Sequence, residues 1–153
     1  MRSAPVLALG QMSDIGLQSA VAEIGRHYGD RVLAIALFGS RVGARARADS
    51  DWDLLLVLDG AVPLRRGLYQ EWDDEVAPIL ETIRSGISPH FVHLPLAETP
   101  PSSLWLEVTL SHEILLDRTG VLESHLARVR SMIDRGQFER RAVHGVNYWR
   151  TVP

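Results

Sequence analysis

Two aspartates and a Gly-Ser pair have the types and spacing that could do chemistry in this sequence. Asp51 and Asp53 open an apolar run, and alternate residues of an extended strand point to the same face. Two carboxylates on one face suit Mg²⁺ or Mn²⁺, which share oxygen ligands with substrate phosphates. Gly39 follows an earlier apolar run, and Ser40 adds a hydroxyl donor. Because glycine lets backbone N–H groups approach a phosphate closely, the two motifs together predict phosphoryl or nucleotidyl transfer.

Each motif also has an ordinary structural explanation. The aspartates could be strand-entry and turn residues, and Gly39-Ser40 could be a common strand-to-helix turn. Turn chemistry does not explain a second aspartate inside an apolar strand, because burying an unpaired charge is costly. We therefore predict that Asp51 and Asp53 are catalytic metal ligands. Gly39, Ser40 and Arg41 are the predicted nucleotide-binding residues, since a guanidinium can bind two phosphate oxygens at once.

Two short apolar runs must position these residues. Residues 32–38 and 51–58 have the length and composition of strands that are buried on both faces. A helix is expected to begin at Ser13 or Asp14 and to end near residue 28. A second helix, from Pro63 to about residue 85, should kink or restart near Ala77, because proline at 78 lacks the N–H that a helix needs.

The remaining pattern predicts a third strand, a short helix, a fourth extended segment and a last helix. They are expected at residues 87–94, from 102, at 113–117 and at 121–135, respectively. Pro89 favours an edge position or an early bulge for the third strand, because proline cannot donate a hydrogen bond to a neighbouring strand. The acids Glu71, Asp73, Asp74 and Glu75 are interpreted as a solvated helix face and not a metal site, and His27, His112, His125 and His144 show no metal-ligand spacing.

The order of these motifs resembles the signature of the polymerase β-type nucleotidyltransferase superfamily. The resemblance rests on Gly39-Ser40, a gap of ten residues, Asp51-x-Asp53 and the apolar strand that follows. The string GSRVGARARADSDWDLLLV is similar to the minimal nucleotidyltransferases (MNT), which are often paired with HEPN-domain proteins. The resemblance implies an α+β fold of the polymerase β-like nucleotidyltransferase type, with a small mixed β-sheet and flanking helices.

The resemblance also implies an activity. A Mg²⁺-dependent (or Mn²⁺-dependent) enzyme of this kind transfers a nucleoside monophosphate, here AMP from ATP, to an acceptor hydroxyl. The acceptor implied is a tyrosine of a HEPN-type toxin, with this chain as the antitoxin. Two alternatives stay open: a module that binds a nucleotide or a partner without turnover, and, more weakly, a small-molecule nucleotidyltransferase of the antibiotic-modifying kind.

A third carboxylate is implied on the strand after Asp51-x-Asp53, but residues 87–94 contain no acid. By approximate register the implied position falls near Phe91, within one or two residues. His90 or His93 could act in its place as an auxiliary base, because neutral imidazole accepts a proton near neutral pH. The ordinary alternative is that both histidines are simple strand residues. The missing acid is the feature that keeps the binding-module alternative open.

Length and charge set the remaining expectations. The 153 residues are expected to form a single nucleotidyltransferase domain, with a core at about 13–117 and a C-terminal helix and tail at 119–153. A net charge of −3 gives no general attraction to nucleic acid, so we expect the basic and aromatic tail to pack on the domain or a partner. The absence of cysteine fits a cytoplasmic protein, no apolar run is long enough to span a membrane, and homo-oligomerisation is left open.

Overall fold

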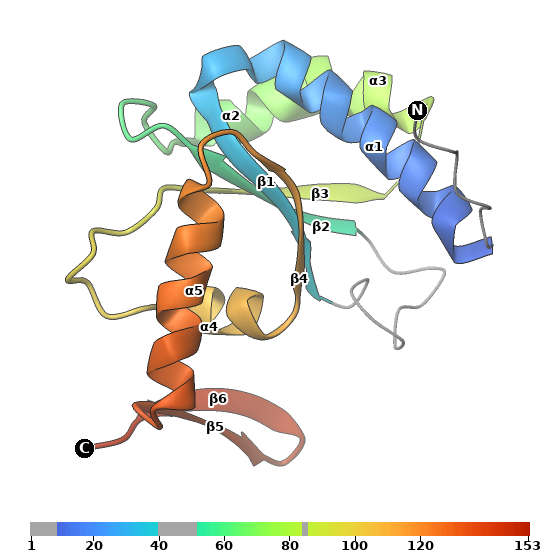
Figure 1. The fold of residues 1–153 in the computed structure, drawn as a ribbon. Coiled ribbons are helices and arrows are strands. Elements are labelled where there is room, and N and C mark those ends of the chain that lie inside the picture. The colour runs from blue at the N-terminus through green and yellow to red at the C-terminus, as the bar shows by residue number, and fades with distance from the viewer. Residues whose placement is uncertain (1–8, 40–51, 84–85) are drawn as a thin grey trace, which may run out of the picture.

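A mixed four-stranded sheet forms the centre of the computed structural model, which describes residues 9–39, 52–83 and 86–153 of the chain, with side chains from residue 15 (Figure 1). The strand order is β3-β2-β1-β4. β1 (Val32–Phe38) runs antiparallel to β2 (Trp52–Leu58) and to β4 (His112–Asp117), whereas β2 runs parallel to β3 (Ile87–Val92). The prediction of a small mixed sheet with flanking helices is confirmed.

Helices cover both faces of this sheet (Figure 1). They are α1 (Leu9–Tyr28), α2 (Arg66–Glu71) and α3 (Ala77–Glu81) on one face and α4 (Ser103–Leu110) and α5 (Val121–Asp134) on the other. Alternate residues of β2 enter the two resulting cores: Leu54 and Leu56 pack on the α1 side, and Leu55 and Val57 on the α5 side. Each of these side chains is fully buried, which stabilises the fold by about 1.5–3 kcal/mol per residue.

The predicted interruption near Ala77 is confirmed. α2 passes into a π-helical turn, η3 (Trp72–Val76), in which the N–H of Ala77 bonds to the carbonyl of Trp72, and α3 follows. Pro78 has no N–H to donate, so the regular α-helical ladder cannot continue through it. The start of α1 was predicted too late, because the helix begins at Leu9 and not at Ser13 or Asp14.

β3 lies at an edge of the sheet, as Pro89 indicated. Tyr69 of α2 lies over this edge, and its hydroxyl accepts a hydrogen bond of 3.4 Å from the N–H of Phe91. A side chain that covers an exposed edge in this way hinders pairing with the strand of another molecule.

The C-terminal residues form a separate two-stranded sheet of β5 (Phe138–Val143) and β6 (Val146–Thr151), below α5 in Figure 1. This hairpin was not predicted, although packing of the tail on the domain was. One such contact is present, because Arg140 donates to Glu107 of α4 at 2.9 Å. Among the described residues, no helix is long and apolar enough to cross a membrane.

Candidate functional site

Asp53 is the second residue of β2 and lies between the two neighbouring strands. Its backbone is paired with Phe38, the last residue of β1, on one side and with Ser88 of β3 on the other. Because side chains alternate along a strand, Asp53 shares the face of Leu55 and Val57. Its carboxylate is about one-third exposed, at 32%. The charged group is therefore held by the sheet but remains open to solvent, as a ligand for a cation or substrate must be.

Gly39 lies directly against this carboxylate. The glycine has a φ of +83°, a left-handed conformation that L residues rarely adopt. A Cβ atom placed on Gly39 would lie 3.0 Å from Oδ2 of Asp53, closer than real Cβ atoms normally approach. The sequence predicted a glycine here so that a phosphate could approach the backbone. In the structure, the residue also makes room for the carboxylate of Asp53.

His90 completes this group from β3. Its Nε2 lies 3.1 Å from Oδ1 of Asp53, and its ring makes an edge contact with Phe38, with ring centroids 5.0 Å apart. The histidine side chain is 40% exposed. The structure therefore brings three of the predicted site residues together: Gly39, Asp53 and His90.

His93 does not join them. Its Nε2 lies 2.6 Å from the carbonyl oxygen of Val62, which packs in the core on the α1 side of the sheet. His93 also follows the far end of β3, whereas Asp53 is aligned with Ser88 near its start. His93 comes five residues after Ser88. At about 3.3 Å per residue, His93 and Asp53 are therefore roughly 16 Å apart along the strand direction.

The strand register excludes Phe91 itself as the third-acid position, which was expected within one or two residues of Phe91. Phe91 lies on the opposite face of the sheet from Asp53, is 6% exposed, and belongs to the core that faces α1. Its ring makes edge contacts with three aromatic side chains: Tyr28, Tyr69 and Trp72. The side chains of β3 that share the face of Asp53 are those of Ser88, His90 and Val92, because Asp53 is aligned with Ser88 and every second residue follows.

Three other predicted site residues, Ser40, Arg41 and Asp51, lie outside the described residues. Their roles in holding a nucleotide and a metal ion therefore stay predictions. Of the two predicted metal ligands, Asp53 is the one that the structure describes, and its carboxylate oxygens are of the type that Mg²⁺ and Mn²⁺ prefer.

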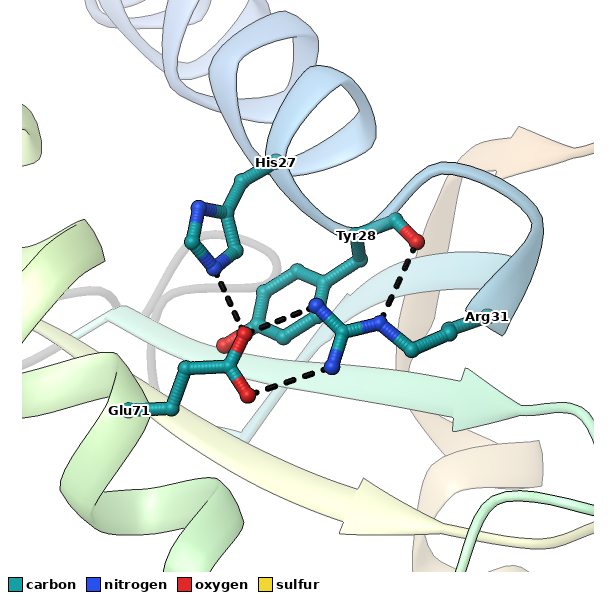
Figure 2. A network of polar contacts seen from close by, with 4 residues as sticks. All are labelled: His27, Tyr28, Arg31 and Glu71. Carbon is teal, nitrogen blue, oxygen red and sulfur yellow. Dashed lines mark hydrogen bonds and ion pairs between the residues drawn. The ribbon is translucent and has the colours of Figure 1, made fainter.

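A second polar group, which the sequence interpretation missed, lies at the opposite end of β1 (Figure 2). Arg31 donates two hydrogen bonds to the carboxylate of Glu71, at 3.1 and 2.7 Å, and Nε2 of His27 lies 2.6 Å from Oε2 of the same carboxylate. The hydrogen bond from Arg31 lowers the pKa of Glu71, and His27 contributes in the same direction against the opposing effect of burial. The interpretation of Glu71 as part of a solvated face is therefore wrong.

No protein-family model and no curated protein matches the sequence. Solved structures of toxin–antitoxin complexes do match the fold. One, with AMP-PNP, aligns with a TM-score of 0.53 at 20% identity over 78% of this chain and 89% of that chain. A MntA–HepT complex gives 0.50 at 18% identity, over 81% and 89% of the two chains. A tri-AMPylated Shewanella oneidensis HEPN toxin in complex with MNT antitoxin gives 0.51 at 17% identity, over 82% and 90%.

Identities of this size support a conclusion about the fold. The agreement extends over most of both chains. The described chain has the nucleotidyltransferase fold of the MntA (minimal nucleotidyltransferase) antitoxin structures.

Proposed function

We propose that this chain is a nucleotidyltransferase antitoxin that transfers AMP from ATP, with Mg²⁺ or Mn²⁺, to a hydroxyl of a HEPN-type toxin in the cytoplasm. The observation that carries the proposal is the carboxylate of Asp53, which lies against Gly39 and beside His90. The fold supports it, as do two of the matching structures, one with AMP-PNP and one with a tri-AMPylated HEPN toxin. The proposed acceptor is a tyrosine of the toxin.

The roles of the residues follow from their chemistry. Asp53, together with Asp51, holds the cation, because carboxylate oxygens are its preferred ligands. Gly39, Ser40 and Arg41 bind the β- and γ-phosphates through backbone N–H groups, a hydroxyl and a guanidinium. When bound, the cation supplies neutralisation of the charge that develops on the phosphates.

In the proposed reaction the acceptor hydroxyl attacks the α-phosphorus of ATP in line. A new oxygen–phosphorus bond forms, the bond from the α-phosphorus to the bridging oxygen breaks, and pyrophosphate leaves. Nδ1 of His90 takes the hydroxyl proton, because Nε2 donates its hydrogen to the carboxylate of Asp53 and the side chain is partly exposed. Most of the rate enhancement comes from positioning the reactants and from stabilising charge.

A binding module without turnover is the second candidate. It is favoured by β3, where residues 87–92 contain no acid and a histidine stands beside Asp53. A cation at this site therefore has one anionic ligand fewer than the nucleotidyltransferase pattern implies. Such a protein would bind Mg²⁺-ATP, or its partner, on the same surface without transferring AMP.

The test uses ATP labelled at the α-phosphate or, in parallel, at the γ-phosphate. Each is incubated with the protein, Mg²⁺ or Mn²⁺, and lysate of its own host. We expect one labelled protein band with the α-label and none with the γ-label, because AMP is transferred and pyrophosphate is released. Asp53→Asn should abolish the band, and Asp74→Asn, which removes an exposed carboxylate from η3, should not.

A band that carries the γ-label, or an α-labelled band that persists in Asp53→Asn, contradicts the proposal. Binding of Mg²⁺-ATP, seen as a rise in Tm, without any labelled band supports the binding module instead.

A further inference from the structure

Three potential metal ligands meet where the end of α1 approaches α2 and η3. They are Nε2 of His27 and one carboxylate oxygen each of Glu71 and Glu75, and all of these atoms lie within 4.8 Å of one another. Among the residues that the structure describes, no other group of three or more His, Cys, Asp or Glu side chains lies close enough together to hold one ion. It lies before the start of β1, whereas Gly39 and Asp53 lie at the other end of that strand.

Zn²⁺ accepts both imidazole nitrogen and carboxylate oxygen as ligands. Zn²⁺ binds both at about 2.0–2.2 Å, so neighbouring ligand atoms in a tetrahedral site are about 3.3 Å apart. Glu75 is exposed, so its side chain can rotate to close the remaining gap. Glu71 directly precedes the π-helical turn η3 and Glu75 lies within it, and such turns are frequent at functional sites.

The surroundings supply the outer contacts that metal ligands normally have. Arg31 donates to both oxygens of Glu71 and fixes its orientation, as Figure 2 shows, and hydrogen bonds of this kind orient ligands in metal sites. Arg31 also places a positive charge near the ion, which the two glutamates outweigh.

Tyr28 provides the second, independent observation. Its side chain is 3% exposed, yet its hydroxyl has no hydrogen-bond partner among the described residues. Buried polar groups are normally hydrogen-bonded. Figure 2 shows the ring of Tyr28 extending toward Glu71, with the hydroxyl at that end of the ring. A water molecule on a bound cation would give this hydroxyl its missing partner.

Solvent can reach the group through a cavity of about 210 Å³. Its lining includes His27 and Glu75, together with Glu23 and Arg26, which form an ion pair with each other. An ion can therefore enter without unfolding of α1 or η3.

We propose that His27, Glu71 and Glu75 bind one divalent cation of the zinc class, at a site separate from Asp53 and independent of nucleotidyl transfer. The ion would join the end of α1 to the segment between α2 and α3. It would stabilise the folded chain by mass action, because the unfolded chain does not hold these side chains together. The competing interpretation is a structural ion-pair network in which Arg31 and His27 bind the carboxylate of Glu71 and no metal ion is bound.

The test titrates the full chain, in an Asp53→Asn background that removes the proposed Mg²⁺ ligand, with Zn²⁺ by calorimetry and with Co²⁺ by visible absorption. We expect one equivalent of Zn²⁺ and the visible bands of tetrahedral Co²⁺. Glu75→Gln should weaken the binding of both ions by about tenfold or more, because changes around metal sites typically cost at least this much affinity. His27→Gln should act in the same direction, and Asp74→Asn, at a neighbouring exposed carboxylate, should leave binding unchanged.

Glu75 is exposed, so its isosteric replacement keeps the fold, which circular dichroism can verify. The proposal is overturned if the background protein binds less than one equivalent of Zn²⁺. It is equally overturned if Glu75→Gln binds Zn²⁺ as tightly as Asp74→Asn does. Neither result bears on AMP transfer, whose test depends on Asp53.

Discussion

The backbone of Gly39 lies so close to Asp53 that a Cβ atom at position 39 would crowd the carboxylate. A Cβ atom at Gly39 would lie 3.0 Å from Oδ2 of Asp53, and the φ of +83° is itself unfavourable for any L residue. A side chain at position 39 is thus disfavoured for two reasons, the backbone conformation and the carboxylate beside it. A glycine with the same backbone conformation but no neighbour can therefore serve as a control, because it shares the effect on stability but not the contact with the carboxylate.

Gly39→Ala should destabilise the protein and also abolish Mg²⁺-ATP binding. The left-handed backbone costs about 1–2 kcal/mol for a residue with a Cβ atom. Gly136→Ala is the matched control, because Gly136 has a φ of +76° but nothing within 4 Å of its Cβ position. Both variants should lose similar free energy of unfolding in urea, whereas only Gly39→Ala should lose the rise in Tm with Mg²⁺-ATP. If Mg²⁺-ATP raises the Tm of both variants equally, crowding of Asp53 has no effect on nucleotide binding.

Asp53→Asn, alone or with Asp51→Asn, should keep the fold and lose Mg²⁺-dependent ATP binding. The pair of Asp53 with His90 is partly exposed, so its loss should cost less than about 1 kcal/mol. Thermal unfolding with and without Mg²⁺-ATP measures both effects. A ligand at 100 times its Kd stabilises a protein by about 2.7 kcal/mol. The assignment of the metal ligand is wrong if the variant keeps the full rise in Tm.

The two histidines of the third-strand region should behave differently. His90→Gln should reduce AMP transfer while ATP binding persists, because His90 faces Asp53. His93→Gln should leave transfer unchanged, because His93 contacts the carbonyl of Val62 on the other side of the sheet. The α-phosphate label measures transfer, and the rise in Tm measures binding. Equal transfer by the two variants would remove His90 from the reaction.

Placing an acid on β3 should succeed at His90 and fail at Phe91. His90→Asp supplies a carboxylate on the face of Asp53, so Mn²⁺ binding should tighten. Phe91→Asp removes a ring that packs against Tyr28 and Trp72. Loss of a buried Phe side chain costs about 3–5 kcal/mol, and the buried charge adds to that cost. Urea unfolding and Mn²⁺ calorimetry test both variants, and a stable Phe91→Asp protein with tighter Mn²⁺ binding would contradict the assignment of faces.

His125 should make the protein less stable as the pH falls below 6.5. Burial beside Trp105 lowers its pKa from 6.5, and the charge of Arg128 lowers it further. The unfolded chain therefore binds a proton at a pH where the folded chain does not, so the contribution of His125 is complete above pH 6.5 and is lost as the pH falls toward the lowered value. His125→Leu should flatten this dependence of the urea midpoint between pH 7.5 and 5.5.

The matched control is His144→Asn in the exposed hairpin turn. His144 has a φ of +52°, which asparagine tolerates. This variant should keep the wild-type dependence on pH. If His125→Leu is as sensitive to acid as wild type, another group is responsible.

Local patterns in the sequence were enough to predict most of the elements. The apolar run at residues 32–38 became β1 with the same bounds, since strands buried on both faces need uninterrupted apolar residues. Pro78 and Pro89 marked the interrupted helix and the edge strand, because proline removes a hydrogen-bond donor wherever it occurs. The order of the motifs placed Gly39 and Asp53 in one predicted site, and the structure brings the two residues together, whereas the roles of Ser40, Arg41 and Asp51 remain predictions.

Contacts between distant segments were decided by the tertiary structure alone. The register of β2 against β3 selects His90 and not Phe91 as the neighbour of Asp53, and a shift of one residue would have reversed the choice. The sequence predicted each strand, but hydrogen bonds between strands set the register. Glu71 looked like a solvated acid because its partners, His27 and Arg31, are more than 30 residues away in the chain. Only the packing of α1 against α2 and η3 brings those charges together, because no local spacing encodes a contact between separate elements.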